Sequence, residues 1–239
     1  MALGPFLDAT GESLTLAAPP CRIVSLIPSV TELLFALGAG AAVAGCTVYC
    51  TEPPDGVATK TRVGGEKNPK LEMIRDLGAD LVIANVEENL REHVRALRSW
   101  GIPVYVIYPH AVAEGIRLVR DLGEVIGRPD EGRAMEATLL AALDDVRRRL
   151  AGRAAPRIFY PIWRRPWMTI GRDTYAHDML TVCNIAFIDW FFPERSYARC
   201  TSPAGRAMRS LFCETAAPPS LLTIGSGVLR TGKLLPIFR

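Results

Sequence analysis

Short apolar runs alternate with amphipathic stretches along the first half of the chain, a pattern typical of parallel strand-helix-strand units. The strand-like runs are Ile23–Leu26, Val43–Cys46, Asp80–Ala84 and Pro103–Tyr108. Helical patterns, with apolar residues three or four positions apart, cover residues 29–37, 71–77, 88–100 and 112–126. Residues 51–69, rich in proline, glycine and charge, are expected to form a long functional loop. This order predicts an α/β fold with an N-terminal lobe over residues 1–128.

The stretch from Arg22 to Gly38 joins the first strand to a helix. Ser29 follows Pro28 in the turn, and Glu32 stands three residues later, which is the spacing of a capping box. Gly38 is a typical stop signal for the helix. Ligands of open α/β sheets bind at the carboxyl ends of parallel strands, where this turn would lie. Ser29 is therefore expected to cap the helix, and it could also contact a ligand.

The second half of the chain begins with one long amphipathic pattern over residues 130–151. At about 1.5 Å per residue such a helix spans roughly 33 Å, enough to join two lobes, and we place a linking helix at 129–153. Strand patterns at Arg157–Pro161 and Trp167–Gly171, and a helix from its cap at Asp173 to Cys183, start a C-terminal lobe over 154–195. A second Rossmann-like α/β lobe is thus predicted.

The alternation stops after residue 195, so the second lobe is expected to be incomplete. Residues 196–239 carry six Lys or Arg and one acidic residue, Glu214, which leaves residues 1–195 with a net charge of −2. We expect this atypical tail to be a frame-shifted or otherwise replaced end of the lobe. It shows no basic run interleaved with aromatic residues, so nucleic-acid binding is not predicted.

Hydrophobic residues make up 49% of the chain, which is enough for sizeable cores. No pattern of a signal peptide follows Met1, and no apolar run reaches transmembrane length. Taken alone, these features predict a cytoplasmic protein.

The cysteines and histidines do not predict a metal site or a resident cofactor. No pair of cysteines has C-x-x-C spacing, and most are expected to be buried as small hydrophobic residues. Cys46 and Cys50 flank Tyr49 closely enough to join a pocket wall, but two thiolates are too few for a metal centre. Among the histidines His93, His110 and His177, only His110 stands at a strand end, where direct chelation could occur.

A series of short motifs links this chain to a known family. They are Asp8–Gly11, Pro19–Pro20, Arg22–Glu32, Leu37–Gly38, Val43–Gly45, Tyr49 with Pro53–Pro54, Val63–Gly64, Leu71–Glu72, Asp80–Ala84, Gly101–Val104, Gly171–Tyr175, Leu180–Cys183 and Asp189. In order and spacing they resemble the iron-siderophore and cobalamin class of substrate-binding proteins of ABC importers, nearest to the vitamin B12-binding members. The likeness covers roughly residues 8–195. It implies two α/β lobes joined by a single long helix, with the ligand held between the lobes.

The resemblance also implies a set of ligand contacts. The ligand would be a metal chelate, most simply a corrinoid, with a ferric siderophore or haem as the alternative. Tyr49 lies on the loop that presents an aromatic ring to the corrin in B12-binding relatives. The opposite wall and the polar contacts would come from Trp163, Trp167, Trp190, Ser29, Glu87, Glu88 and Asn89. Each of the aromatic residues could instead be a core residue.

The resemblance further implies a monomeric, non-catalytic protein outside the cytoplasm that docks on an ABC transporter permease. Glu72 stands at the position of the first docking glutamate, although a carboxylate in a first helical turn is also favoured by the helix dipole. Two other readings stay open. The chain could be a cytoplasmic enzyme or sensor on the same fold, although it carries no catalytic motif, or it could be a damaged family member.

Overall fold

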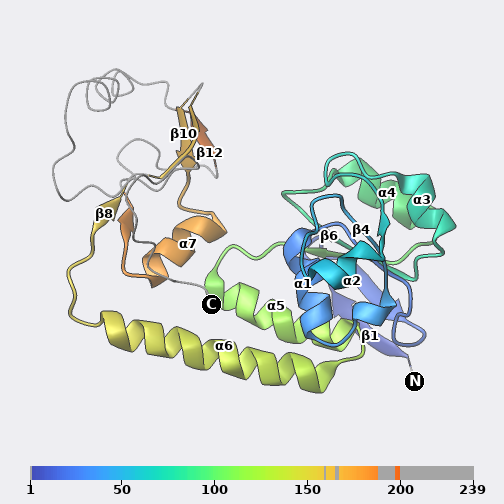
Figure 1. Cartoon of the computed structure of the whole chain (residues 1–239), viewed down its shortest axis with the longest axis horizontal. Coiled ribbons are helices and arrows are strands. Elements are labelled where there is room, and N and C mark those ends of the chain that lie inside the picture. Colours follow the sequence, from blue (N-terminus) through green and yellow to red (C-terminus); the bar gives the residue numbers. More distant parts are fainter. Residues whose placement is uncertain (1, 159, 165–166, 188–196, 200–239) are drawn as a thin grey trace. The chain divides into compact units, whose positions relative to one another are not determined.

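The computed structural model describes residues 2–158, 160–164, 167–187 and 197–199. These residues form two compact units, shown in Figure 1. The N-terminal unit holds Met1–Pro109 and Ala113–Asp144, and the C-terminal unit holds His110–Val112 and the described chain from Asp145 onward. The domain boundaries 1–128, 129–153, 154–195 and 196–239 stay predictions.

The N-terminal unit is built on a parallel sheet of five strands in the order β5-β4-β3-β6-β7. The strands are β3 Ile23–Ser25, β4 Val43–Cys46, β5 Thr61–Arg62, β6 Leu81–Asn85 and β7 Val104–Ile107. The helices that connect and follow them are α1 Pro28–Ala36, α2 Pro54–Ala58, α3 Leu71–Asp76, α4 Arg91–Ser99 and α5 Val112–Val125, with a 3₁₀ turn at Gly40–Ala42. The predicted α/β fold with a parallel sheet is confirmed.

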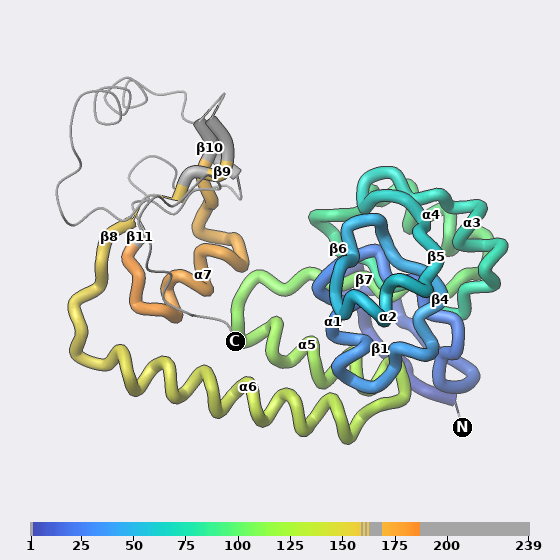
Figure 2. The backbone as a smooth tube through the Cα atoms, viewed as in Figure 1, coloured from blue at the N-terminus to red at the C-terminus, as the bar shows by residue number. Residues whose placement is uncertain are grey.

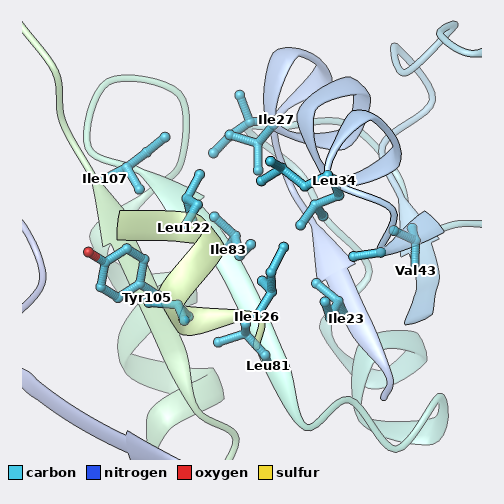
Figure 3. Close-up of a cluster of buried hydrophobic side chains, with 14 of the residues drawn as sticks. Ile23, Ile27, Leu34, Val43, Leu81, Ile83, Tyr105, Ile107, Leu122 and Ile126 are labelled. Carbon is cyan, nitrogen blue, oxygen red and sulfur yellow. The ribbon is translucent and has the colours of Figure 1, made fainter. Parts of the chain in front are cut away.

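Successive side chains of the central strands point to opposite faces of the sheet, and helices cover both faces. Both sets of side chains are therefore buried. On one face, strand residues such as Ile23 and Ile83 pack against Leu34 of α1 and Leu122 of α5, as Figure 3 shows. On the other face, Val82 and its neighbours join the side chains of α3 and α4. The near-continuous apolar runs of the sequence therefore mark strands that lie between two layers of helices.

The helix after β3 begins one residue earlier than predicted, and Ser29 is not its cap. The N-cap is Ile27, in an extended conformation and without a side-chain hydrogen bond to the helix. Pro28 takes the first helical position, because its fixed φ suits a helix start and its missing N–H would have no partner there. Ser29 is consequently an exposed residue of the first turn. The stop at Gly38 is confirmed, since this glycine has a φ of +74° at the helix end.

Two further segments differ from their predictions. Residues 51–69 do not form one loop, because Pro54 starts the short helix α2 and Thr61–Arg62 add the edge strand β5. The helix expected from Glu88 starts at Arg91. Residues 85–90 form a turn held by asparagine side chains, and this turn delays the start of the helix.

A hairpin that the sequence pattern did not reveal precedes the sheet. Strands β1 Leu3–Leu7 and β2 Ser13–Leu16 pair antiparallel, and Leu3, Phe6, Leu14 and Leu16 pack against the same core as α1 and α5. Its strands are short and only partly buried, so their apolar alternation is weak.

The carboxylate of Asp8 fastens this hairpin to the sheet. Its side chain is 1% exposed, and Oδ2 lies 2.6 Å from the Arg98 guanidinium and accepts a hydrogen bond from Val106 N at 3.2 Å. Oδ1 accepts hydrogen bonds from Thr10 N at 2.8 Å and Glu12 N at 3.1 Å. Burial acts to raise the pKa of Asp8, but the hydrogen bonds from Thr10, Glu12 and Val106 outweigh it and lower the pKa. One buried carboxylate thus connects the hairpin, α4 and β7.

The long helix predicted over residues 130–151 is confirmed as α6, Pro129–Leu150. The end of α5 and the start of α6 lie side by side, as the backbone trace in Figure 2 shows. A Cβ atom on Gly123 would come within 2.8 Å of Gly132 Cα, so the close approach requires glycine at both positions. Among the described helices, none has the length and apolar character needed to cross a bilayer.

The C-terminal unit holds two small sheets. Strand β8 Arg157–Ile158 pairs parallel with β11 Ala186–Phe187, and β10 Trp167–Ile170 lies antiparallel between β9 Pro161–Arg164 and β12 Tyr197–Arg199. Helix α7, Tyr175–Val182, leads into β11. Its cap is Thr174, whose Oγ1 accepts a hydrogen bond from His177 N at 3.3 Å, so the predicted cap at Asp173 is wrong. The predicted atypical tail lies outside the described residues except for β12.

Candidate functional site

The carboxyl ends of β3, β4, β5 and β6 meet at one edge of the parallel sheet. The edge loops are the segments that follow these strands, namely residues 26–29, 47–53, 63–70 and 85–90. Hydrogen bonds tie them to one another: Val48 N donates to Gly64 O at 2.9 Å, and Asn89 Nδ2 donates to Glu66 O at 3.0 Å. Ligands of open α/β sheets bind at this kind of edge, and these loops are already connected before any ligand arrives.

Tyr49 projects from the edge loops with 59% of its surface exposed. The neighbouring loop passes beside the ring at Gly65, where an added Cβ atom would lie in ordinary van der Waals contact, 3.4 Å from Tyr49 Cε2. Val48 and Val86 are also exposed, at 52% and 42%. Side chains of this kind offer an apolar and aromatic surface, which a broad macrocycle would cover.

Asn85 and Asn89 hold the edge loop after β6 in shape. Asn85 Oδ1 accepts a hydrogen bond from Glu87 N at 2.7 Å, and Asn89 Oδ1 accepts one from Asn85 N at 2.8 Å. Asn89 is buried, and its Nδ2 also donates to the loop after β5. This predicted ligand contact therefore positions the turn, whereas Glu87 and Glu88 point their carboxylates to solvent.

Acidic side chains outnumber basic ones on these loops. The pKa of Glu66 is raised, mainly because the side chain is partly buried. The negative charge of Glu88 raises it further. Lys67 Nζ donates a hydrogen bond to the Glu87 carbonyl oxygen, which links the loops after β5 and β6. Glu66 and Lys67 were not predicted as site residues, although the Gly64-Gly65 pair before them marks a tight approach of chains. The edge loops therefore carry four carboxylates, those of Glu52, Glu66, Glu87 and Glu88, and two ammonium groups, those of Lys67 and Lys70.

Glu72 lies in the first turn of α3, directly after these loops, and is exposed. Within the described residues it forms no ion pair, and the positive end of the α3 dipole favours a carboxylate at this position. The carboxylate is available to a partner that approaches the sheet edge.

The cysteines differ from the expected pattern of burial. Cys46 and Cys50 are 0% and 1% exposed, as expected of small hydrophobic residues, but Cys21 and Cys183 are exposed. Cys200 and Cys213 lie outside the described residues. Cys46 and Cys50 flank the turn carrying Tyr49, among polar partners rather than only apolar ones.

The predicted second wall belongs to the C-terminal unit. In the backbone pairing of β9 and β10, Trp163 lies opposite Met168 and Trp167 lies opposite Arg164. Trp190 lies outside the described residues. A hollow in the same unit is lined by Val146, Arg149, Leu150 and Arg153, and none of these is a predicted ligand contact.

Metal chelation by side chains finds little support in the described part of the chain. No group of three or more His, Cys, Asp and Glu side chains that could hold a metal ion occurs there. His110 Nδ1 lies 3.1 Å from the Asp173 carbonyl oxygen, next to α7. The arrangement at the sheet edge is suited to non-covalent recognition of a larger molecule.

Comparisons with known proteins agree with this architecture. The family model for periplasmic binding proteins matches residues 23–199. The vitamin B12-binding protein of Salmonella choleraesuis is 30% identical over 167 residues, which cover 70% of this chain and 61% of that protein. The chain thus spans a little under two thirds of this relative's length.

Solved structures show the same two-lobe fold. The periplasmic vitamin B12-binding protein BtuF of Vibrio cholerae superimposes with a TM-score of 0.70 at 24% identity, over 80% of this chain and 74% of that one. The periplasmic haem-binding protein RhuT from Roseiflexus sp. RS-1 gives a TM-score of 0.66 at 24% identity, over 78% and 72% of the two chains. With a family model that matches most of its length, this chain belongs to the periplasmic binding protein family.

Proposed function

We propose that this protein binds a metal chelate for ABC-type import, and that the chelate is a corrinoid. The observation that carries the proposal is the exposed Tyr49 on a preformed sheet edge in a chain that is similar to vitamin B12-binding proteins. Ser29, Glu87 and Glu88 would contribute polar contacts from the N-terminal lobe. Trp163, Trp167 and Trp190 would contribute from the C-terminal lobe.

The charge of the edge loops supports a corrinoid over the anionic ligands of the same family. The edge loops contain four glutamates, Glu52, Glu66, Glu87 and Glu88, against two lysines, Lys67 and Lys70, so the field at this edge is negative. Haem carries two propionates and ferric catecholates are polyanions, so both would be repelled. A corrinoid is rimmed by amides, whose N–H groups can donate to carboxylates. Haem and ferric siderophores remain the alternative ligands, since haem-binding RhuT shares the fold.

The proposed role is recognition and delivery without catalysis. Members of this family are binding proteins, and the exposed side chains of the described edge loops offer hydrogen-bonding and apolar groups rather than a nucleophile paired with a base. The partners would be an ABC transporter permease, which Glu72 would contact, and the ligand itself. The protein would act as a monomer outside the cytoplasm, as its family implies. A cytoplasmic enzyme or sensor on this fold is the alternative, and turnover of a bound chelate by purified protein would favour it.

Replacing Tyr49 by alanine is expected to weaken cyanocobalamin binding by about 1–2 kcal/mol, a roughly 5- to 30-fold rise in Kd, because the stacking surface is lost. Tyr49→Phe keeps the ring and is the matched control, with little change expected. Isothermal titration of both variants tests this. Equal affinities for wild type and Tyr49→Ala, with the fold intact by circular dichroism, would remove Tyr49 from the site.

A further inference from the structure

Cys46 and Cys50 form a buried pair that flanks the turn carrying Tyr49. Cys46 ends β4, and a turn closed by the hydrogen bond from Cys50 N to Thr47 O at 3.3 Å brings the second cysteine back toward the first. The two thiols are close enough to share a hydrogen bond. Two free thiols in contact, at most 1% exposed, need an explanation beyond the filling of space.

Polar groups surround both sulfur atoms. Cys50 Sγ lies 3.2 Å from Thr47 Oγ1 and 3.1 Å from Thr31 Oγ1. The Arg62 guanidinium lies 3.1 Å from Cys46 Sγ, and the same nitrogen donates to the Cys50 carbonyl oxygen at 2.7 Å. This buried network holds the thiols in a defined place and sets a positive charge beside them.

The network favours one thiolate and one thiol. Hydrogen bonds from Cys46 first, and then from Thr31 and Thr47, lower the pKa of Cys50 to about 5. The pKa of Cys46 is raised, mainly because its proton is held by Cys50 and because the group is buried. A metal cation is disfavoured here, since Arg62 already places a positive charge against Cys46. A nucleophilic thiolate beside a thiol that can attack second is the arrangement needed for thiol-disulfide exchange.

We propose that Cys46 and Cys50 are a dithiol site that a disulfide oxidant converts to an intramolecular disulfide, closing a ring of the chain around Tyr49. The Cys50 thiolate attacks one sulfur of the oxidant, forms a mixed disulfide and expels one thiolate. Cys46 loses its proton, attacks Cys50 Sγ and expels the second thiolate. Starting from one thiolate and one thiol, the protein loses two electrons and one proton, and the oxidant becomes one thiol and one thiolate, which takes a proton from solvent. Because both sulfurs are buried, exchange occurs when the 47–53 loop opens or before the loop closes in folding.

Redox titration of the native protein tests the proposal without any variant. The protein is equilibrated in mixtures of reduced and oxidised glutathione, quenched with acid, alkylated, and mapped by mass spectrometry under non-reducing conditions. The expected product is a Cys46–Cys50 linkage, two hydrogen atoms lighter, while exposed Cys21 and Cys183 do not enter it. The reference is the guanidinium-unfolded protein in the same glutathione buffers. If the buffers oxidise Cys46 and Cys50 there, but both cysteines of the folded protein stay reduced and are alkylated, the proposal is wrong.

A variant tests whether the hydrogen bonds around Cys50 promote oxidation, or whether the closeness of the two sulfur atoms is enough. Thr47→Val keeps the shape of the side chain but removes a hydroxyl that lies against Cys50, and it is expected to slow disulfide formation at pH 5 by about two- to fivefold. Cys21→Ser is the matched control and should oxidise at the wild-type rate. Equal rates for Thr47→Val and wild type would show that the polar network does not activate Cys50.

Discussion

Replacing Asp8 by alanine is expected to lower the free energy of unfolding by about 3 kcal/mol, the largest stability effect of a single change at a described residue outside the apolar core. The substitution removes the partner of Arg98 and leaves the buried N–H of Val106 and the partly buried N–H of Thr10 without their acceptor. The side chain of Arg98 is 28% exposed, so water can hydrate its guanidinium when Asp8 is absent. This hydration limits the loss of folding free energy. Urea denaturation followed by circular dichroism measures the change.

An exposed ion pair provides the control for Asp8. Asp76 lies 3.8 Å from Arg75 with 74% of its side chain exposed, so Asp76→Ala should change stability by less than about 0.5 kcal/mol. Because the pKa of Asp8 is lowered on folding, its stabilisation is present above the unfolded value near 3.8 and is lost as pH falls through the folded value. The stability gap between wild type and Asp8→Asn should therefore narrow below about pH 4. A gap that stays constant to pH 2 would contradict this role.

Glu72→Lys is expected to abolish stimulation of the partner transporter's ATPase while ligand affinity stays unchanged. The side chain is exposed at the start of α3, beside the edge loops but outside them. Reversal of its charge would replace an attraction to a basic permease surface by a repulsion, and rim charges act mainly on association. The readout is ATP hydrolysis by the reconstituted transporter with and without the binding protein.

Glu131→Lys is the matched control for Glu72. Glu131 also lies in a first helical turn, at α6, so both substitutions cost a similar helix-dipole term of about 0.3–1 kcal/mol, and Glu131→Lys in addition breaks a surface ion pair with Arg128 at 3.6 Å. The start of α6 adjoins Pro19, which precedes β3, and it therefore lies at the opposite edge of the sheet from Glu72. Normal stimulation by Glu72→Lys, or loss of ligand binding in that variant, would show that Glu72 is not a docking residue.

The parallel core could be predicted because its signals are local. An apolar run such as Ile23–Leu26 marks a strand that is buried on both faces. A glycine such as Gly38 marks the end of a helix through its backbone conformation. The cap at Ser29 was wrong because Pro28 is an equally good helix start, and single-sequence spacing does not show which of two local signals prevails.

The site could be predicted only in part, because its remaining features depend on contacts between distant segments. The family motif predicts Tyr49 as a ligand contact; its ring is exposed and accessible to a ligand, and the contact stays a prediction. The structural role of Asn89 depends on Glu66 in another loop, and the polar setting of Cys46 depends on Arg62 from a neighbouring strand. Such pairings arise from strand order, which hydrophobic periodicity does not encode.

The most direct test of the account is calorimetric titration of the purified protein with cyanocobalamin, haem and a ferric catecholate under identical conditions. We predict a corrinoid Kd of about 1 μM or tighter, and at least roughly tenfold weaker binding of the two anionic chelates. Absence of heat with cyanocobalamin and dicyanocobinamide, together with tight binding of haem or the ferric catecholate, would contradict the proposed ligand.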